Sequence, residues 1–266
     1  MNKIIALILS IAASVQVVAQ NKAQTYVWED EKYARERLID MERMVVDISF
    51  DPSAGMVKGQ VSHFFKPLRK SLDSVFFDAP KIDIKAVFVN GKKANFKTNS
   101  EGVTVLFEKP LAWETNDSIR IQYEAKPKKG IYFIGWNDKN NLSRKQIWTQ
   151  GQGVDNRYWI PMWDDLNDKL ITETIVRFDQ KYKVLSNGTK AMERLNKDGT
   201  KTWHYKMTKP HASYLLMLGI GIYDIKEAKS KSGVPLRMYH YPEHSERTDL
   251  IYKHTADIMN FFENEI

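Results

Sequence analysis

Hydrophobic residues alternate with polar ones over most of the stretch from residue 43 to residue 126, and this period of two limits the possible folds more than any other feature. Apolar side chains occupy every second position in four stretches, at residues 44–50, 82–85, 103–107 and 119–123. Because successive side chains of a strand point to opposite faces of a sheet, the alternation predicts strands with one buried face. Asn90-Gly91, between two short apolar stretches, predicts a tight β-hairpin.

A second set of strands is predicted after residue 170. Its apolar stretches are residues 174–178, 182–185, 203–207, 214–222 and 236–241. Ser186-Asn187-Gly188 and Asp198-Gly199 predict turns, and residues 191–196 are interpreted as a further turn segment. Because no helix is predicted between these strands, residues 43–241 are expected to form one mainly β domain, an antiparallel sandwich or a set of stacked sheets.

The periodicity becomes helical in residues 242–266. Apolar side chains recur at helical spacing, at Leu250, His254, Ile258, Phe261 and Phe262. Ser245 is the predicted N-cap of this helix and Glu246 lies in its first turn. The apolar face either docks on the sheet or meets something that these 266 residues do not contain.

The N-terminus has the pattern of a secretory signal peptide. Lys3 gives a short positive region, residues 4–11 are almost all apolar, and Val17-Val18-Ala19 supplies small residues before a cleavage point. We therefore expect residues 1–19 to be a signal peptide, cleaved after Ala19. The mature protein is then expected to be periplasmic or extracellular, in a Gram-negative bacterium.

An uncleaved membrane anchor is the alternative, although Ser10, Ser14 and Gln16 interrupt an apolar stretch already short for a bilayer core of ~30 Å.

Residues 20–42 are expected to be a charge-rich lead-in that can hold a short helix. The formal charge of +7 comes from lysines and arginines interleaved with acids, which disfavours a nucleic-acid surface. The absence of cysteine leaves His, Asp and Glu as the only strong metal ligands.

Two patterns that resemble metal sites are discounted on structural grounds. Residues 240–244 read H-Y-P-E-H, which fits the H-x-x-E-H zinc motif, but Pro242 should prevent the helix that would align the two histidines. Residues 164–168 read D-D-L-N-D, a pattern that holds magnesium and diphosphate in all-helical enzymes. Here it lies between predicted strands, so loop capping is the better interpretation.

The segment between Trp136 and Trp163 is the most unusual part of the chain. It holds four of the seven tryptophans, with glutamines at positions 146, 150 and 152 and glycines at 151 and 153. Amide groups among aromatic side chains suit one wall of a ligand cleft. A buried aromatic cluster, with the glutamines satisfying loop backbone, fits the same residues equally well.

A series of short motifs that begins in this segment resembles a known family. The motifs are Thr149-Gln150-Gly151-Gln152, Asp155-Asn156-Arg157-Tyr158-Trp159, Ile160-Pro161, Asp164, Asp168-Lys169, Ser186-Asn187-Gly188 and Tyr214-Leu215. In this order they are similar to the N-terminal domain of the aminopeptidase N and leukotriene hydrolase family of zinc metallopeptidases. The resemblance extends from about residue 43 to residue 266. It implies a saddle-shaped β domain, followed at residues 242–266 by the first helix of an α-helical, thermolysin-like catalytic domain.

The resemblance also implies roles for individual residues. Gln152 matches the position whose side-chain oxygen helps hold the free amino group of a peptide substrate, and Gln150 matches a position that lines the pocket for the first substrate side chain. Arg157 and Asp164 are expected to brace the loop. The zinc ligands and catalytic residues of the family are expected beyond Ile266, so this chain should bind no zinc and be inactive alone, and its partners should be peptide substrates and its own catalytic domain.

Two other functions remain open at this point. A non-catalytic family member could use the same cleft wall as a scaffold for peptides or glycans at the cell surface. A self-contained sugar-binding β-sandwich requires an open aromatic platform, made of Trp136, Trp148, Trp159 and Trp163.

Overall fold

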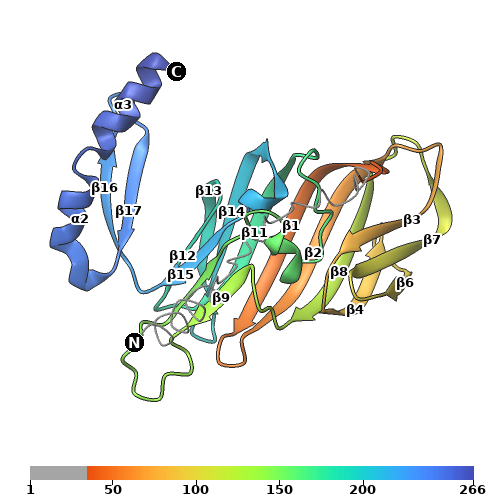
Figure 1. The fold of residues 1–266 in the computed structure, drawn as a ribbon, viewed down its shortest axis with the longest axis horizontal. Helices are drawn as coiled ribbons and strands as arrows, with labels where there is room; N and C mark the ends of the chain where they lie inside the picture. The colour runs from red at the N-terminus through yellow and green to blue at the C-terminus, as the bar shows by residue number, and fades with distance from the viewer. Residues whose placement is uncertain (1–34) are drawn as a thin grey trace, which may run out of the picture. The chain divides into compact units, whose positions relative to one another are not determined.

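The computed structural model describes residues 35–266, and the predicted signal peptide therefore lies outside the described residues. Most of residues 35–266 form β-strands (Figure 1). The strands are β1 (Ile39–Asp51), β2 (Met56–Pro67), β3 (Ser71–Asp78), β4 (Ile82–Val89), β5 (Lys92–Lys93), β6 (Asn95–Thr98), β7 (Gly102–Ala112), β8 (Asp117–Ala125), β9 (Ile131–Ile134), β10 (Gln146–Thr149), β11 (Leu170–Asp179), β12 (Lys183–Ser186), β13 (Thr189–Leu195), β14 (Thr200–His211), β15 (Leu218–Gly221), β16 (Asp224–Lys229) and β17 (Pro235–His240).

The helical elements are short. Within residues 35–266 there are three 3-10 turns, η1 (Asp155–Tyr158), η2 (Ser213–Leu215) and η3 (Pro242–His244), and two α-helices at the C-terminal end, α2 (Ser245–Tyr252) and α3 (Thr255–Glu265). No helix within residues 35–266 has the length and apolarity that crossing a membrane requires.

The described strands form four sheets. The largest has the order β13-β14-β11-β1-β2-β8-β4-β5, and a four-stranded sheet has the order β12-β15-β10-β9. β3, β7 and β6 form a third sheet, and β16 and β17 form a hairpin. These are the stacked, mainly antiparallel sheets expected from the sequence.

Among the described strands one pair is parallel, and no alternation pattern in the sequence predicts it. β1 pairs with β11 in a parallel register from Arg43 opposite Ile171 to Ser49 opposite Arg177. The parallel pairing brings the chain that enters β11 beside the start of β1. It therefore fixes the end of the segment that carries the motif series.

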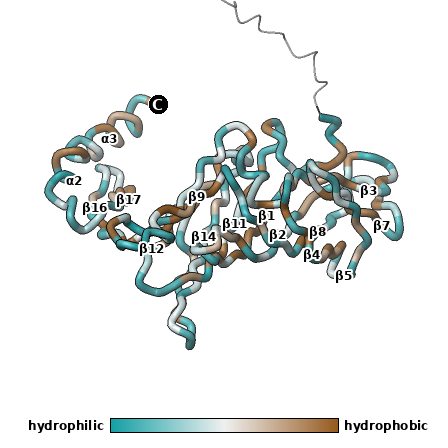
Figure 2. Tube along the Cα trace, turned by 60° about the horizontal axis from the view of Figure 1, so that its bottom comes forward, coloured by the Kyte–Doolittle hydropathy of each residue, from teal (hydrophilic) through white to brown (hydrophobic). Residues whose placement is uncertain are grey.

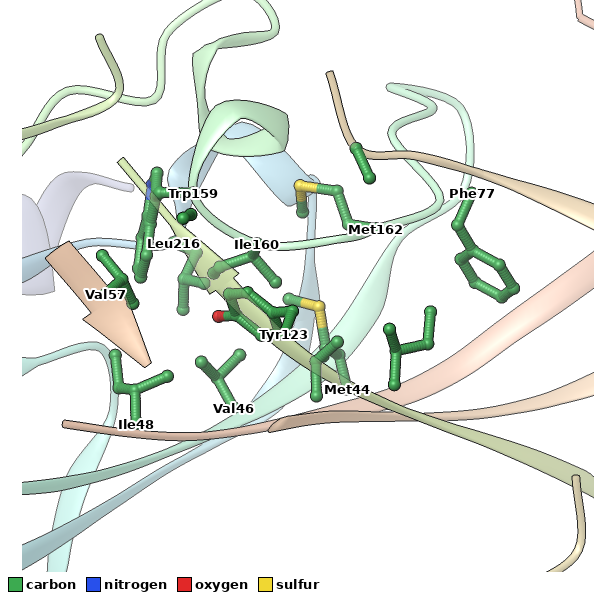
Figure 3. Close-up of a cluster of buried hydrophobic side chains, with 14 of the residues drawn as sticks. Met44, Val46, Ile48, Val57, Phe77, Tyr123, Trp159, Ile160, Met162 and Leu216 are labelled. Carbon is green, nitrogen blue, oxygen red and sulfur yellow. The ribbon is translucent and has the colours of Figure 1, made fainter. Parts of the chain in front are cut away.

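The core lies on one face of the large sheet and includes residues from the motif segment. Figure 3 shows Met44, Val46 and Ile48 of β1 with Tyr123 of β8, beneath a loop that supplies Trp159, Ile160 and Met162. Ile160 is fully buried, as is Trp159. Burial of several large apolar side chains, at roughly 1.5–3 kcal/mol each, holds this irregular segment against the sheet.

The hairpin predicted at Asn90-Gly91 is confirmed, whereas the turn predicted at residues 191–196 is wrong. Asn90 and Gly91 both have positive φ, at 48° and 80°, as a tight hairpin between β4 and β5 requires. Residues 191–196, predicted as a turn, lie mostly within β13. The first strand begins at Ile39, so residues 39–42 of the expected lead-in are already part of β1.

The C-terminal helix also differs from its prediction. It is divided into α2 and α3, and the first residue of α2 is Ser245 rather than its N-cap, which is His244 without a side-chain capping bond. Thr248 instead donates its hydroxyl to the carbonyl oxygen of His244 at 2.8 Å. Apolar stretches of α3 appear brown in Figure 2, and its side chains Ile258, Phe261 and Phe262 are exposed.

Candidate functional site

The chain that runs from the end of β10 into residues 150–152 is hydrogen-bonded to two neighbouring segments. The hydroxyl of Thr149, at the end of β10, accepts a hydrogen bond from the backbone N–H of Leu218 at 2.8 Å. One residue later, the backbone N–H of Gln150 donates to the carbonyl oxygen of Gly130 at 2.9 Å. These bonds fix the direction in which the chain leaves the four-stranded sheet.

Gly151 is the tightest point of the segment. A Cβ atom there would lie 2.4 Å from the side-chain nitrogen of Asn156 and 2.5 Å from the carbonyl oxygen of Tyr214. Asn156 is itself buried, and its side-chain nitrogen donates to the carbonyl oxygens of Ser213 and Leu216, each at 3.1 Å. Its side-chain oxygen accepts from the indole N–H of Trp159 at 2.9 Å. Only glycine fits position 151 without moving Asn156 or the backbone.

The two glutamines predicted to bind substrate lie on either side of this fixed point. Both Gln150 and Gln152 are exposed. Neither side-chain amide forms a hydrogen bond with another residue of the described part of the chain. Gln146, the third glutamine, differs because its side-chain oxygen accepts a hydrogen bond from the hydroxyl of Tyr241. The first two glutamines are therefore free to meet a ligand, and the third is not.

Arg157 and Asp164, predicted to brace the loop, form an ion pair. The Nε of Arg157 lies 2.7 Å from a carboxylate oxygen of Asp164, whose side chain is 1% exposed. The other oxygen of Asp164 accepts from the hydroxyl of Ser213 at 2.7 Å. Arg157 also lies 3.4 Å from a carboxylate oxygen of Asp78, at the end of β3. This network joins residues 150–169, called the motif loop from here on, to η2 and β3.

The D-D-x-x-D segment consists of loop contacts, as the sequence interpretation held. Asp165 accepts from the backbone N–H of Asn167 at 2.9 Å. Asp168 accepts from the backbone N–H of Met41 at 3.1 Å and from the guanidinium of Arg37 at 2.8 Å. Burial raises the pKa of Asp168, against the opposing effects of the Met41 hydrogen bond and Arg37. Asp168 thus joins the end of the loop to the start of β1.

A buried histidine of β2 forms a hydrogen bond with the motif loop. The Nε2 of His63 lies 2.9 Å from the carbonyl oxygen of Pro161, and the ring stacks on Phe77 at 4.5 Å. The carbonyl can only accept, so Nε2 carries the proton. Nδ1 is buried and has no hydrogen-bond partner within residues 35–266. Burial lowers the pKa of His63 to about 4, so the ring is neutral at physiological pH.

The tryptophans do not form the open platform that a sugar-binding module needs. Trp159 is 0% and Trp163 3% exposed, and Trp136 packs edge-on against Phe178 at 5.8 Å. Only Trp148, at 39%, presents much surface, and it stacks on Tyr132 at 4.7 Å. The sugar-platform hypothesis is therefore wrong for these four residues.

The two histidines of the H-x-x-E-H match lie in different elements, as expected from the helix-breaking Pro242 between them. His240 ends β17, whereas His244 ends η3, so no continuous helix joins them. The Nε2 of His244 lies 2.9 Å from the guanidinium of Arg144. Within residues 35–266 no three side chains of His, Asp or Glu are grouped so that they could hold a metal ion.

Sequence reasoning missed the residues that hold the loop through other elements. Asn156 was noted only as part of a motif, and Ser213, Gly130 and Asp78 were given no role at the loop. Their contacts join positions such as Asn156 and Ser213 that lie far apart along the chain. The positive φ of 86° at Gly130 has no local signal except the glycine itself.

A family model described as the Peptidase M1 N-terminal domain matches residues 31–215. The chain is 26% identical over 205 residues to "Probable aminopeptidase 1" of Sulfurisphaera tokodaii, a match that covers 74% of this chain and 23% of that protein. It is 25% identical over 202 residues to "Leucyl aminopeptidase" of Saccharolobus solfataricus, covering 74% of this chain and 24% of that protein.

A third relative is "Glutamyl aminopeptidase" of Mus musculus, 24% identical over 169 residues, with 62% of this chain and 18% of that protein covered. The chain spans about a quarter or less of the length of these curated relatives.

Proposed function

The chain belongs to the peptidase M1 family through its N-terminal domain, and on this premise we propose that it is the substrate-facing β domain of an exported zinc aminopeptidase. In this proposal Gln152 accepts a hydrogen bond from the free amino group of a peptide, and Gln150 lines the pocket for the first side chain. The proposal rests most on one observation. Two exposed glutamine side chains, neither hydrogen-bonded within residues 35–266, flank a glycine that the surrounding backbone holds in place.

The fixed backbone around Gly151 is what makes Gln152 suitable for recognition. A side chain on a rigid frame loses less entropy on binding than one on a loose loop. The amide oxygen of Gln152 would accept a charge-assisted hydrogen bond from an ammonium group, worth about 1.5–3 kcal/mol. Such a contact selects peptides with free amino ends and supports exopeptidase rather than endopeptidase action.

Gln152 carries no charge, so it orients an ammonium group without neutralising it. Arg157 and Asp164 satisfy each other and are buried or half-buried, which suits bracing better than substrate contact. In this proposal the remaining charge compensation comes from another domain of the enzyme.

The described residues do not fit a zinc ion. Cysteine is absent from the whole chain, and no group of three or more His, Asp or Glu within residues 35–266 is arranged to hold a metal. Three protein ligands are the usual minimum for catalytic zinc. We therefore propose that the zinc ligands and the catalytic base lie in a second domain, and we assign no catalytic step to this chain.

Purified residues 20–266 should neither hydrolyse leucine p-nitroanilide nor retain zinc. The measurements are nitroaniline release and metal content by mass spectrometry after dialysis against zinc. The full-length protein under the same conditions is the positive control. Hydrolysis by residues 20–266 that a chelator suppresses would contradict the proposal, and a full-length protein without activity would favour the scaffold function.

Gln152→Ala in the full-length enzyme is expected to raise KM for leucine p-nitroanilide about 10- to 100-fold, because 1.4 kcal/mol corresponds to a factor of ten. The Gln152→Glu variant should bind at least as well as the wild type, since it restores a charge opposite the ammonium group. Asn140→Ala, which removes another exposed amide whose side chain forms no hydrogen bond within residues 35–266, is the matched control and should leave KM unchanged. Equal KM values for Gln152→Ala and the wild type would show that Gln152 does not hold the amine.

A further inference from the structure

A groove of about 680 Å³ lies at the end of the large sheet, and none of its lining residues belongs to the motif loop. Its walls come from the hairpin that joins β4 to β5 and from the second half of β7. Figure 2 labels β5 beside β4 and β7, and β4 contacts both β6 and β7. The groove therefore separates the edge of the large sheet from the three-stranded sheet.

Each wall of this groove includes a stretch of strand that is unpaired on the side of the groove. β5 is the last strand of the large sheet, and its two residues pair only with Val89 and Phe88 of β4. β6 pairs with β7 from Asn95 opposite Leu106 to Thr98 opposite Val103 and goes no further. On the other side of β7, residues 107–110 form a bulge opposite the single residue Asp73 of β3. Residues 107–110 of β7 are therefore paired neither with β6 nor with β3.

The groove combines an apolar floor with a positive rim. Half-buried Leu106, Phe107 and Leu111 of β7 line it together with Val89 and Ala94 of the hairpin. Its charged residues are Lys92, Lys93, Lys109 and Glu108, all exposed. None of these three lysines lies in an ion pair within the described residues. The rim therefore has a net positive charge that the described residues do not neutralise.

We propose that this groove binds an extended, acidic polypeptide segment, which adds as a strand between β5 and the bulged part of β7. Exposed main-chain groups of a strand edge bind extended peptides by strand addition, with side-chain pockets providing the specificity. The lysines repel the same edge of another copy of the chain, which is how natural edges avoid self-association, while they attract acidic side chains. Apolar side chains of the bound segment, alternating with the acidic ones, would face the floor.

The test uses a fluorescein-labelled peptide of about six residues, long enough to span ~20 Å, in which valine alternates with aspartate or glutamate. Fluorescence anisotropy with residues 20–266 measures its Kd at low and high salt. We expect binding that weakens with salt, and no binding of the same peptide with lysine in place of the acidic residues. An acidic peptide with alternate backbone nitrogens methylated keeps its charge but loses donors, and should bind at least about tenfold more weakly.

The double charge reversal Lys92→Glu/Lys93→Glu should weaken binding of the acidic peptide about tenfold or more, whereas Lys139→Glu, on a distant exposed loop, should not. These substitutions are at exposed positions, and unchanged thermal unfolding confirms that the variant is folded. Equal affinities for wild type and the double variant would overturn the proposal. Equal binding of the methylated peptide would overturn strand addition, and binding of phosphatidylglycerol vesicles without binding of the peptide would overturn the choice of partner.

Discussion

Replacing Asp164 by alanine is expected to lower the free energy of unfolding of residues 20–266 by about 3 kcal/mol, at the low end of the cost of breaking a buried ion pair. The carboxylate of Asp164 is 1% exposed and receives hydrogen bonds from Arg157 and Ser213. Its loss leaves the guanidinium half-buried, with Asp78 at 3.4 Å as the remaining partner. Urea unfolding followed by tryptophan fluorescence measures the change.

The neighbouring carboxylate provides the control for this experiment. Asp165→Ala removes only a cap of the Asn167 backbone N–H, so it should cost about 1 kcal/mol or less. Arg157→Leu/Asp164→Leu removes both charges, and should recover part of the stability that Asp164→Ala loses. A loss for Asp164→Ala no larger than that for Asp165→Ala would contradict the role of the ion pair in holding the loop.

Acid is expected to destabilise the domain through His63, before most carboxylates titrate. The unfolded chain binds a proton at His63 below about pH 6.5, the ordinary histidine pKa, whereas the folded chain binds none until its pKa of about 4. Because the unfolded state holds more protons in this window, stability falls as the pH falls from about 6.5 to 4, by about 3 kcal/mol at most. The part of the stability that depends on neutral His63 is fully present above about pH 6.5.

The His63→Gln variant separates this effect from other titrations. Glutamine can donate to the carbonyl of Pro161 but does not titrate. Urea unfolding at a series of pH values should give a shallower pH dependence for the variant between pH 6.5 and 4. Burial also lowers the pKa of His211, so the variant should keep part of the slope. Identical slopes for wild type and variant would contradict the assignment to His63.

The strands were predictable because their signal is local. Alternation in residues 44–50 and 119–123 reports a half-buried strand whatever its partner, and both stretches lie in strands of the large sheet. The partner is not local. The parallel pairing of β1 with β11 joins residues more than a hundred positions apart, and no alternation pattern specifies it. The division into α2 and α3 likewise occurs at residues whose periodicity continues across the break.

The candidate site was predictable only through the order of its motifs. Residue chemistry alone left the glutamines of residues 146–152 open between cleft wall and structural support. The structure divides them, with Gln146 bonded to Tyr241 and the side chains of Gln150 and Gln152 exposed. The residues that hold the loop, such as Ser213, contribute through packing across sheets, which no spacing along the sequence reveals.

The central claim is that Gln152 receives the amino group of a peptide, and two inhibitors that differ only in that group test it most directly. L-Leucinamide carries the amine, and 4-methylpentanamide is the same molecule without it. Their inhibition constants are measured for the full-length enzyme and for Gln152→Ala. The account predicts that the substitution weakens L-leucinamide about tenfold or more and leaves 4-methylpentanamide within about twofold. Equal changes for both inhibitors, or no change for either, would contradict it.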